Sequence, residues 1–182
     1  MTIQAKSADE LLALLDIERA HLLARIECVP PAHRAERPGA GQWSAAEIVE
    51  HVARVEGGVA RMITKRAGEP LTATPEAIAA AQMTPRKIVA VRVRTTKFDA
   101  PERVVPTGTL TAVEAVEQLM AARAALKAAF READPAILDG SLAPHPFIGP
   151  LTLRAWVELV AHHDARHAAQ MTDVADHWLA AH

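Results

Sequence analysis

The sequence contains little of what several common kinds of protein need. Its single cysteine, Cys28, excludes an intramolecular disulfide and a zinc site built from several thiolates. It has no tyrosine, three phenylalanines and three tryptophans, which argues against a surface that stacks nucleobases. The 20 basic and 22 acidic residues give a formal net charge of −2, so no positive excess is available for a nucleic-acid backbone.

Long apolar runs are also missing. No stretch approaches the ~20 uncharged apolar residues that a membrane-spanning helix requires. The longest mild candidate, residues 110–130, is interrupted by Glu114, Glu117, Arg123 and Lys127. Residues 1–9 lack the basic segment and apolar run of a secretory signal. We therefore expect a cytoplasmic protein with neither a membrane partner nor a nucleic-acid partner.

The residues that are present describe a folded domain rich in histidine. Half of the 182 residues are apolar and 23% are charged, which is a balance typical of a chain with its own core. At roughly 150 residues per domain, the length predicts one domain over residues 1–182. The unusual abundance is histidine, with nine residues. Their placement along the predicted helices decides the functional interpretation.

Capping boxes predict where the long helices begin. In this motif a hydroxyl side chain caps the first backbone N–H groups, and a carboxylate three residues later bonds back. The motif occurs at Ser7 with Glu10, Ser44 with Glu47 and Thr111 with Glu114, and Thr152 after Gly149-Pro150 is a fourth start. Helical spacing of apolar residues then predicts helices over about residues 8–28, 44–66, 111–132 and 152–181. In the third helix the inward stripe is expected to be Val113, Val116, Leu119, Met120 and Phe130.

About 45 residues separate the second and third predicted helices. Residues 75–82 read as a short helix. Residues 85–94 favour a helix weakly, because Pro85 suits a first helical position although β-branched residues follow. Residues 98–110 and 134–150 are predicted as loops. Four long helices with one long crossover between the second and third predict an all-α four-helix bundle.

The fourth predicted helix carries two histidines on its apolar face. His163 and His167 are four residues apart, which places their Cβ atoms ~5–6 Å from each other. They fall in the middle of an inward stripe that reads Trp156, Val160, His163, His167, Met171, Val174 and Trp178. Unpartnered polar groups there would cost about 1–3 kcal/mol each. A metal ion would satisfy both rings, and bonds to backbone or carboxylate groups are the alternative.

The second predicted helix supplies a third histidine. His51 lies three residues after Ile48 and four before Val55, so it also faces inward. Bundle metal sites are built from ligands on facing helices. Three histidine ligands and an open position form the catalytic pattern of zinc sites. With no thiolate cluster and no inward carboxylate pair, nitrogen ligation favours Zn, Ni, Cu or Fe over Mg or Ca.

Several segments resemble the DinB-like (DinB/YfiT-like) metalloprotein superfamily. Residues 43–52 (WSAAEIVEHV) resemble its helix-two signature, and residues 163–171 (HDARHAAQM) resemble its C-terminal H-x-x-x-H-x-x-Q block. Residues 145–152 (HPFIGPLT) resemble the loop that precedes that helix, and residues 100–106 resemble the middle loop. The similarity spans about residues 8–175.

The resemblance implies both a site and a function. It implies a four-helix bundle with a divalent transition metal, foremost zinc or nickel, on His51, His163 and His167. The superfamily includes transferases that use low-molecular-weight thiols such as bacillithiol or mycothiol, and also metal-dependent hydrolases. We therefore expect a thiol S-transferase or detoxification enzyme acting on a small molecule. The alternatives are a hydrolase of a small ester or amide and a non-enzymatic, metal-stabilised binding or dimerisation module, since a surface helix face could support a homodimer.

Two further residues are candidates for catalysis. Hydrolysis needs a base near the metal, and Asp164 and His145 are the visible candidates. Asp164 completes an H-D-x-x-H pattern, whereas zincins place a glutamate base at that position. If Asp164 is not the base, we expect it to be exposed or hydrogen-bonded to a metal ligand. His145 is expected to line the mouth of the site.

Other residues near the site have weaker assignments. Glu47 could bond to the second nitrogen of His51, besides serving its capping box. We expect His162 off the ligand face at the pocket rim, Gln170 near a ligand or the bundle interior, and Arg166 on the surface. The remaining expectations are a buried or inert Cys28, a core-packing Trp43, and solvated His21, His33, His177 and His182.

Overall fold

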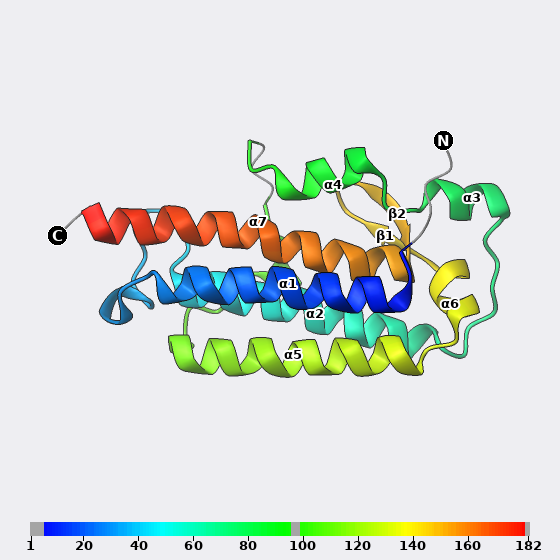
Figure 1. Ribbon diagram of the computed structural model, residues 1–182, viewed down its shortest axis with the longest axis horizontal. Coiled ribbons are helices and arrows are strands. Elements are labelled where there is room, and N and C mark those ends of the chain that lie inside the picture. Colours follow the sequence, from blue (N-terminus) through cyan, green and yellow to red (C-terminus); the bar gives the residue numbers. More distant parts are fainter. Residues whose placement is uncertain (1–5, 96–98, 181–182) are drawn as a thin grey trace.

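Four long helices form the protein and confirm the predicted bundle (Figure 1). The computed structural model describes residues 6–95 and 99–180. The long helices are α1 (Ala8–Glu27), α2 (Ala45–Arg66), α5 (Ala112–Glu132) and α7 (Leu153–Ala180). Position 181 of the fourth predicted helix, Phe98 of the predicted middle loop and His182 lie outside the described residues. No helix in the part of the chain that the structure describes is long and apolar enough to cross a membrane.

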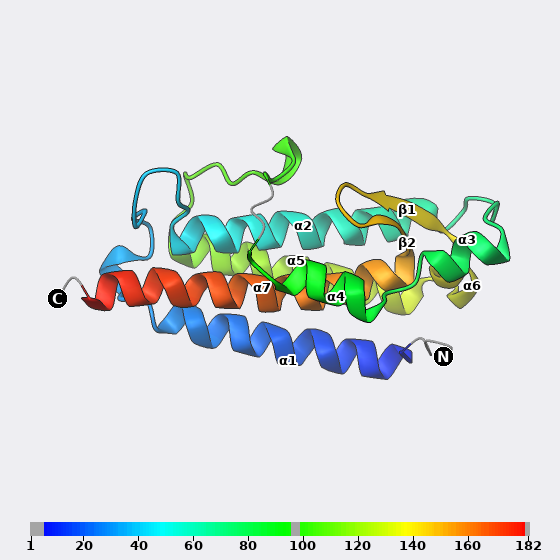
Figure 2. The same cartoon turned by 90° about the horizontal axis from the view of Figure 1, so that it is seen from above.

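The long crossover decides how the helices run. In Figures 1 and 2, α1 and α7 run in one direction and α2 and α5 in the other. The crossover between α2 and α5 contains α3 (Pro75–Ala80), α4 (Pro85–Arg92) and a 3-10 turn (Glu102–Val104), so both predicted short helices are confirmed. It returns the chain to the end where α2 began, and α4 contacts α7 on the way (Figure 2).

The predicted capping boxes are all formed. In α2, the Ser44 hydroxyl accepts a hydrogen bond from the Glu47 backbone N–H at 3.2 Å, and Glu47 Oε2 accepts one from Ser44 N–H at 2.8 Å. The same reciprocal pair begins α1 and α5. At the start of α7, the Thr152 hydroxyl accepts from Ala155 N–H at 3.1 Å. Each cap stabilises its helix by about 1 kcal/mol.

The predicted loop over residues 134–150 is wrong. It contains α6 (Pro135–Gly140) and an antiparallel hairpin of β1 (Leu142–His145) and β2 (Gly149–Thr152). Prolines weaken the strand signal because they cannot donate to a ladder. Here Pro144 and Pro150 pair with each other, at a position where neither strand needs an N–H.

The core is divided into two apolar clusters by a layer of charge. One cluster includes Leu15, Val59 and Leu126, and the other includes Leu22, Val52 and Leu119. Between them each long helix contributes one charged residue, and we call these four residues the ionic layer: Arg19, Glu56, Arg123 and Asp164.

The ionic layer explains why the inward stripe of α5 was mispredicted. Val113 and Met120 are 68% and 49% exposed, whereas Leu119 and Phe130 are buried as expected. The buried face of α5 runs instead through Ala115, Leu119, Arg123, Leu126 and Phe130. A stripe that contains an ion-paired arginine cannot be found from apolar residues alone.

Candidate metal centre

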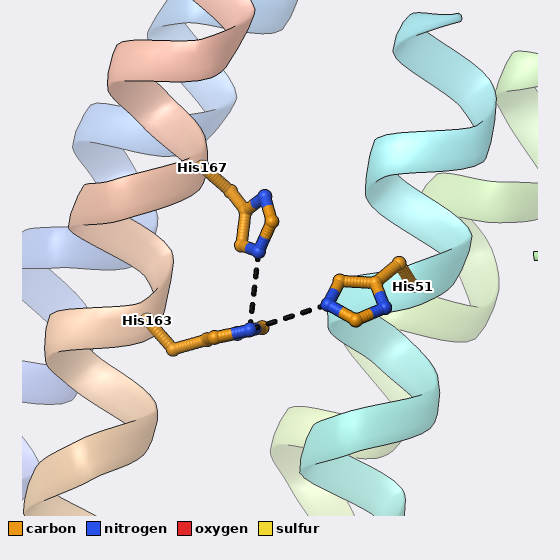
Figure 3. A group of neighbouring side chains, drawn as sticks. All are labelled: His51, His163 and His167. Carbon is orange, nitrogen blue, oxygen red and sulfur yellow. Dashed lines mark hydrogen bonds between the residues drawn. The ribbon is translucent and has the colours of Figure 1, made fainter. Parts of the chain in front are cut away.

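The bundle brings the three predicted ligands together. His51 extends from α2 toward His163 and His167 on α7 (Figure 3). Their Nε2 atoms are 3.3 Å apart between His51 and His163, and 3.1 Å apart between His163 and His167. One nitrogen from each ring lies within 4.8 Å of the others, so this histidine cluster could hold a metal ion.

Two of the rings are oriented through their other nitrogen. His51 Nδ1–H donates to the carbonyl oxygen of Val104 at 2.8 Å, which ties the ring to the 3-10 turn of the crossover. His167 Nδ1–H donates to Oε1 of Gln170 at 2.8 Å, one turn further along α7. Because each neutral ring carries one proton, Nε2 of both residues presents a lone pair.

Protons alone cannot satisfy this cluster. Nε2 of His163 can carry one proton and donate it to one neighbour, so in at least one of the two short contacts the lone pair of His51 or His167 receives no proton. Protonating a second ring is disfavoured, because burial lowers the pKa of His51 and lowers those of His163 and His167 well below the ordinary value. The arrangement is therefore suited to a cation that three nitrogens share.

A large pocket opens beside the histidine cluster. It has a volume of about 1300 Å³ and is lined by α2, α7, α4, the hairpin and the segment over residues 99–105. Part of its wall is apolar and consists of Val55, Val59, Met62, Trp156 and Leu159. A pocket of this size is large enough for a small organic molecule.

A family model matches nearly the whole chain. The model for the DinB superfamily matches residues 8–171. The chain belongs to the DinB superfamily. The chain is also similar in sequence to the uncharacterized protein YuaE of Bacillus subtilis (strain 168), with 25% identity over 148 residues. That match covers 76% of this chain and 81% of YuaE.

A solved structure supports the fold of this DinB-superfamily protein. The crystal structure of TT2238, a four-helix bundle protein, is similar with a TM-score of 0.58 at 24% sequence identity. The similarity covers 92% of this chain and 99% of TT2238. At this level of identity the likeness concerns the fold alone.

The two candidate catalytic residues occupy very different places. Asp164 is 0% exposed and belongs to the ionic layer, where it accepts from Arg19 Nε and Arg123 Nη2, both at 2.9 Å. The expectation that Asp164 is either exposed or hydrogen-bonded to a metal ligand is therefore wrong. His145 lies at the end of β1 and lines the pocket, as expected. Burial and the nearby charge of Arg103 lower the pKa of His145 to about 4.

The residues that orient the ligands were largely missed. Glu47 does not contact His51; its carboxylate bonds to Arg37 at 2.9 Å and to the Ser44 backbone. Gln170 was placed near the site, and its spacing of three residues from His167 was the available signal for the hydrogen bond. No sequence signal points to the carbonyl of Val104, since every residue has one.

Several neighbouring residues depart from expectation. His162 is buried and accepts from Arg92 Nη1 at 3.1 Å, and it does not line the pocket. Arg166 lines the pocket and donates to two carbonyls of the α4 end, so it is more than a surface residue. Trp43 packs against the core as expected, and in addition its ring lies 4.9 Å from that of His51 and lines the pocket.

The remaining polar residues lie outside the histidine cluster. His33 stacks on Trp178 with ring centroids 4.2 Å apart, whereas the side chain of His21 is 67% exposed. His177 is exposed and lines the pocket. Cys28 is exposed and its thiol contacts the carbonyl of Ala24, so the expectation of burial was wrong.

Proposed function

We propose that this DinB-superfamily protein is a metal-dependent enzyme of thiol S-transferase or detoxification type. A divalent transition metal, foremost zinc or nickel, would be held by His51, His163 and His167. The observation that carries the proposal is the convergence of three Nε2 atoms at the wall of a pocket, with too few protons to satisfy them.

The donor set fits such an ion. Three nitrogens bound at about 2.0–2.1 Å in a tetrahedral arrangement lie about 3.3–3.4 Å from each other. Two of the three contacts, at 3.3 and 3.1 Å, are close to that separation, and the third pair lies within 4.8 Å, so the rings would need to close in on the ion on one side only. Imidazole nitrogen suits Zn, Ni, Cu and Fe and does not suit Mg or Ca.

Different residues of the site would orient the metal ligands and bind the substrate. A metal in this position would supply a Lewis acid that lowers the pKa of a thiol. Gln170 and the Val104 carbonyl hold two of the ligand rings in the tautomer that binds metal. The apolar wall from Val55 to Met62 and the ring of Trp156 would bind the carbon skeleton of a small-molecule substrate and exclude water.

The placement of the two candidate bases favours thiol transfer over hydrolysis. Hydrolysis requires a side chain that removes a proton from water. Asp164 is engaged by two arginines inside the ionic layer, and Nδ1 of His145 already accepts backbone hydrogen bonds. A thiol whose pKa is lowered by a bound metal would release its proton to solvent, and so would need no such base. The pocket volume favours a small-molecule enzyme over a purely structural module, and a homodimer remains a prediction.

The decisive test starts with the metal content of protein purified without an affinity tag. We expect about one equivalent of zinc or nickel in the wild type, in line with a three-ligand site, and none in His163→Ala. The cobalt-substituted protein is then titrated with bacillithiol, mycothiol and mercaptoethanol. A sulfur-to-cobalt charge-transfer band is expected with at least one thiol, followed by conjugation of an electrophile such as chlorodinitrobenzene.

A pair of adjacent glycines provides the matched control for the pocket. A Cβ at Gly58 would meet no atom within 4 Å and would enter the pocket, whereas a Cβ at Gly57 would lie 3.4 Å from Arg61 and outside it. Both leucine variants gain up to about 1 kcal/mol of helix propensity. Gly58→Leu should impair conjugation and Gly57→Leu should not. Absence of metal, or a cobalt spectrum that no thiol changes, would overturn the proposed function.

A further inference from the structure

The side chain of His145 closes the turn of the hairpin. Its Nδ1 accepts hydrogen bonds from the backbone N–H groups of Phe147 at 3.2 Å and Ile148 at 3.4 Å. The turn then reaches Gly149, whose φ of 78° suits a residue without a Cβ. Asparagine and aspartate commonly bond to the backbone two residues on in this way. The turn alone therefore does not require histidine.

These two hydrogen bonds determine where the proton of the His145 ring is. Both backbone groups are donors, so Nδ1 must present its lone pair, and the one proton of the neutral ring is on Nε2. The lowered pKa of about 4 agrees with a ring that is neutral near pH 7. His145 is consequently a donor at Nε2 and has no free lone pair there.

The ring is held at the pocket wall. It packs against Trp156 with centroids 5.0 Å apart, and Trp156 is itself fixed by a hydrogen bond from its Nε1–H to the Ala143 carbonyl at 3.2 Å. His145 and all three residues of the histidine cluster line the same pocket. Across residues 6–95 and 99–180, no group hydrogen-bonds to Nε2 of His145.

The pocket thus contains two kinds of nitrogen. The histidine cluster presents lone pairs, and His145 presents an N–H. We propose that His145 is a substrate-binding residue whose Nε2–H donates to an oxygen acceptor, a carboxylate or carbonyl, of the small molecule beside the metal. This rests on the proposed function. It also gives the substrate class more precisely: a thiol or electrophile that carries such an oxygen within reach of the hairpin.

The first test needs no metal. Long-range ¹H–¹⁵N NMR of the metal-free protein at pH 7 is expected to show an unprotonated Nδ1 and a protonated Nε2 for His145. Acetate added to this sample is expected to shift the Nε2 resonance of His145. The opposite tautomer, or an Nε2 resonance that acetate leaves unchanged, overturns the assignment whether or not the metal site is real.

The second test uses two thiols of similar size on the cobalt-substituted protein. Mercaptoacetate carries a carboxylate and 1-propanethiol does not. His145→Asn retains an acceptor near the Nδ1 position and removes the donor, whereas His145→Gln retains an amide donor near the Nε2 position. His145→Asn should bind mercaptoacetate about tenfold to a hundredfold more weakly, as expected for a lost hydrogen bond to a charged group. Its affinity for 1-propanethiol should not change.

The glutamine variant and the paired thiols separate this role from a structural one. His145→Gln should recover much of the mercaptoacetate affinity. Equal weakening of both thiols in His145→Asn would assign His145 to the turn alone and overturn the proposal. If neither thiol binds the wild type, the proposed function fails, and the acetate titration alone then decides the role of His145.

Discussion

The bundle contains two polar clusters, the ionic layer and the histidine cluster, that differ in how many of their polar groups find a partner within the chain. The ionic layer pairs two guanidinium groups with two carboxylates, and Arg19 and Arg123 each bond to both Glu56 and Asp164. In the histidine cluster three ring nitrogens face one another, and neutral rings carry too few protons to satisfy both short contacts. Both clusters lie in the interior of the same four helices.

Adjacent residues of α7 contribute to these two clusters. His163 faces the pocket, and Asp164, rotated by about 100° around the helix, faces the ionic layer. A buried polar group must find a partner, and the ionic layer finds its partners within the chain. The histidine cluster can only find one from outside. The difference indicates that the first cluster supports the fold and makes the second the candidate site.

The largest expected effect comes from breaking the ionic layer. Glu56→Gln keeps the shape of the side chain but leaves two buried arginines with one carboxylate. Removal of one partner from a buried ion pair costs about 3–5 kcal/mol. Urea denaturation followed by circular dichroism should show this loss, while the folded fraction keeps its metal content.

A surface pair provides the control for this variant. The side chain of Asp16 is 60% exposed and pairs with Lys127 at 2.5 Å. Asp16→Asn should cost no more than about 1 kcal/mol, as exposed ion pairs do. A Glu56→Gln protein that retained its stability but lost its metal would contradict the division of roles between the clusters.

The sequence predicted the histidine cluster but not the ionic layer, for a physical reason. The histidine pair on α7 was found because spacing of four residues within an apolar stripe is a local pattern, and His51 shared that property on α2. The ionic layer was missed because a charged residue inside a stripe looks like an interruption. Arg123 is acceptable in the core only because Glu56 and Asp164 arrive from other helices.

Contacts made by backbone groups were also beyond sequence reasoning. The four-helix fold follows from caps and apolar spacing, which are local. The hydrogen bond from His51 to Val104 joins positions 53 residues apart, and nothing distinguishes that carbonyl in the sequence. The hairpin that places His145 is obscured by its prolines. Local patterns therefore predicted the candidate ligands, whereas the groups that orient them are visible only in the tertiary structure.

An intermediate effect is expected from the residue that orients His167. Gln170→Ala removes the acceptor of the Nδ1 proton, so the ring can rotate or change tautomer. Loss of such a partner typically weakens metal binding tenfold to a hundredfold, or about 1.4–2.7 kcal/mol. Competition with a chromogenic chelator measures this change.

Two variants on the same helix sharpen the Gln170 prediction. Gln170→Glu keeps an acceptor and should preserve the affinity for metal. Thr172→Ala removes a hydroxyl that donates to the Ala168 carbonyl, at 3.2 Å, and should have no effect on metal binding. Equal affinity in the wild type and Gln170→Ala would show that the His167 ring is held by packing alone.

The smallest effect per residue is a pH dependence of stability to which the histidine cluster contributes, as does His145 with its pKa of about 4. Burial lowers the pKa values of His51, His163 and His167 in the folded state, so below about pH 6.5 the unfolded chain binds protons that the folded protein does not. The stability of the metal-free protein should therefore fall as the pH falls. Between pH 7 and pH 5.5 each of His163 and His167 should account for up to about 1 kcal/mol, and His51, whose pKa is lowered less, for less than that.

Urea denaturation of the metal-free protein at the two pH values tests this. His51→Ala should reduce the pH-dependent loss of stability by the contribution of His51. His21→Ala should leave that loss unchanged, because the His21 ring is exposed. Glu56→Gln should lower stability at both pH values, because it leaves two arginines, which stay charged throughout this range, with one carboxylate. If His51→Ala left the loss unchanged, the cluster would be open to solvent protons. The distinction between an ionic layer that is paired within the chain and a histidine cluster that needs a cation from outside would then no longer hold.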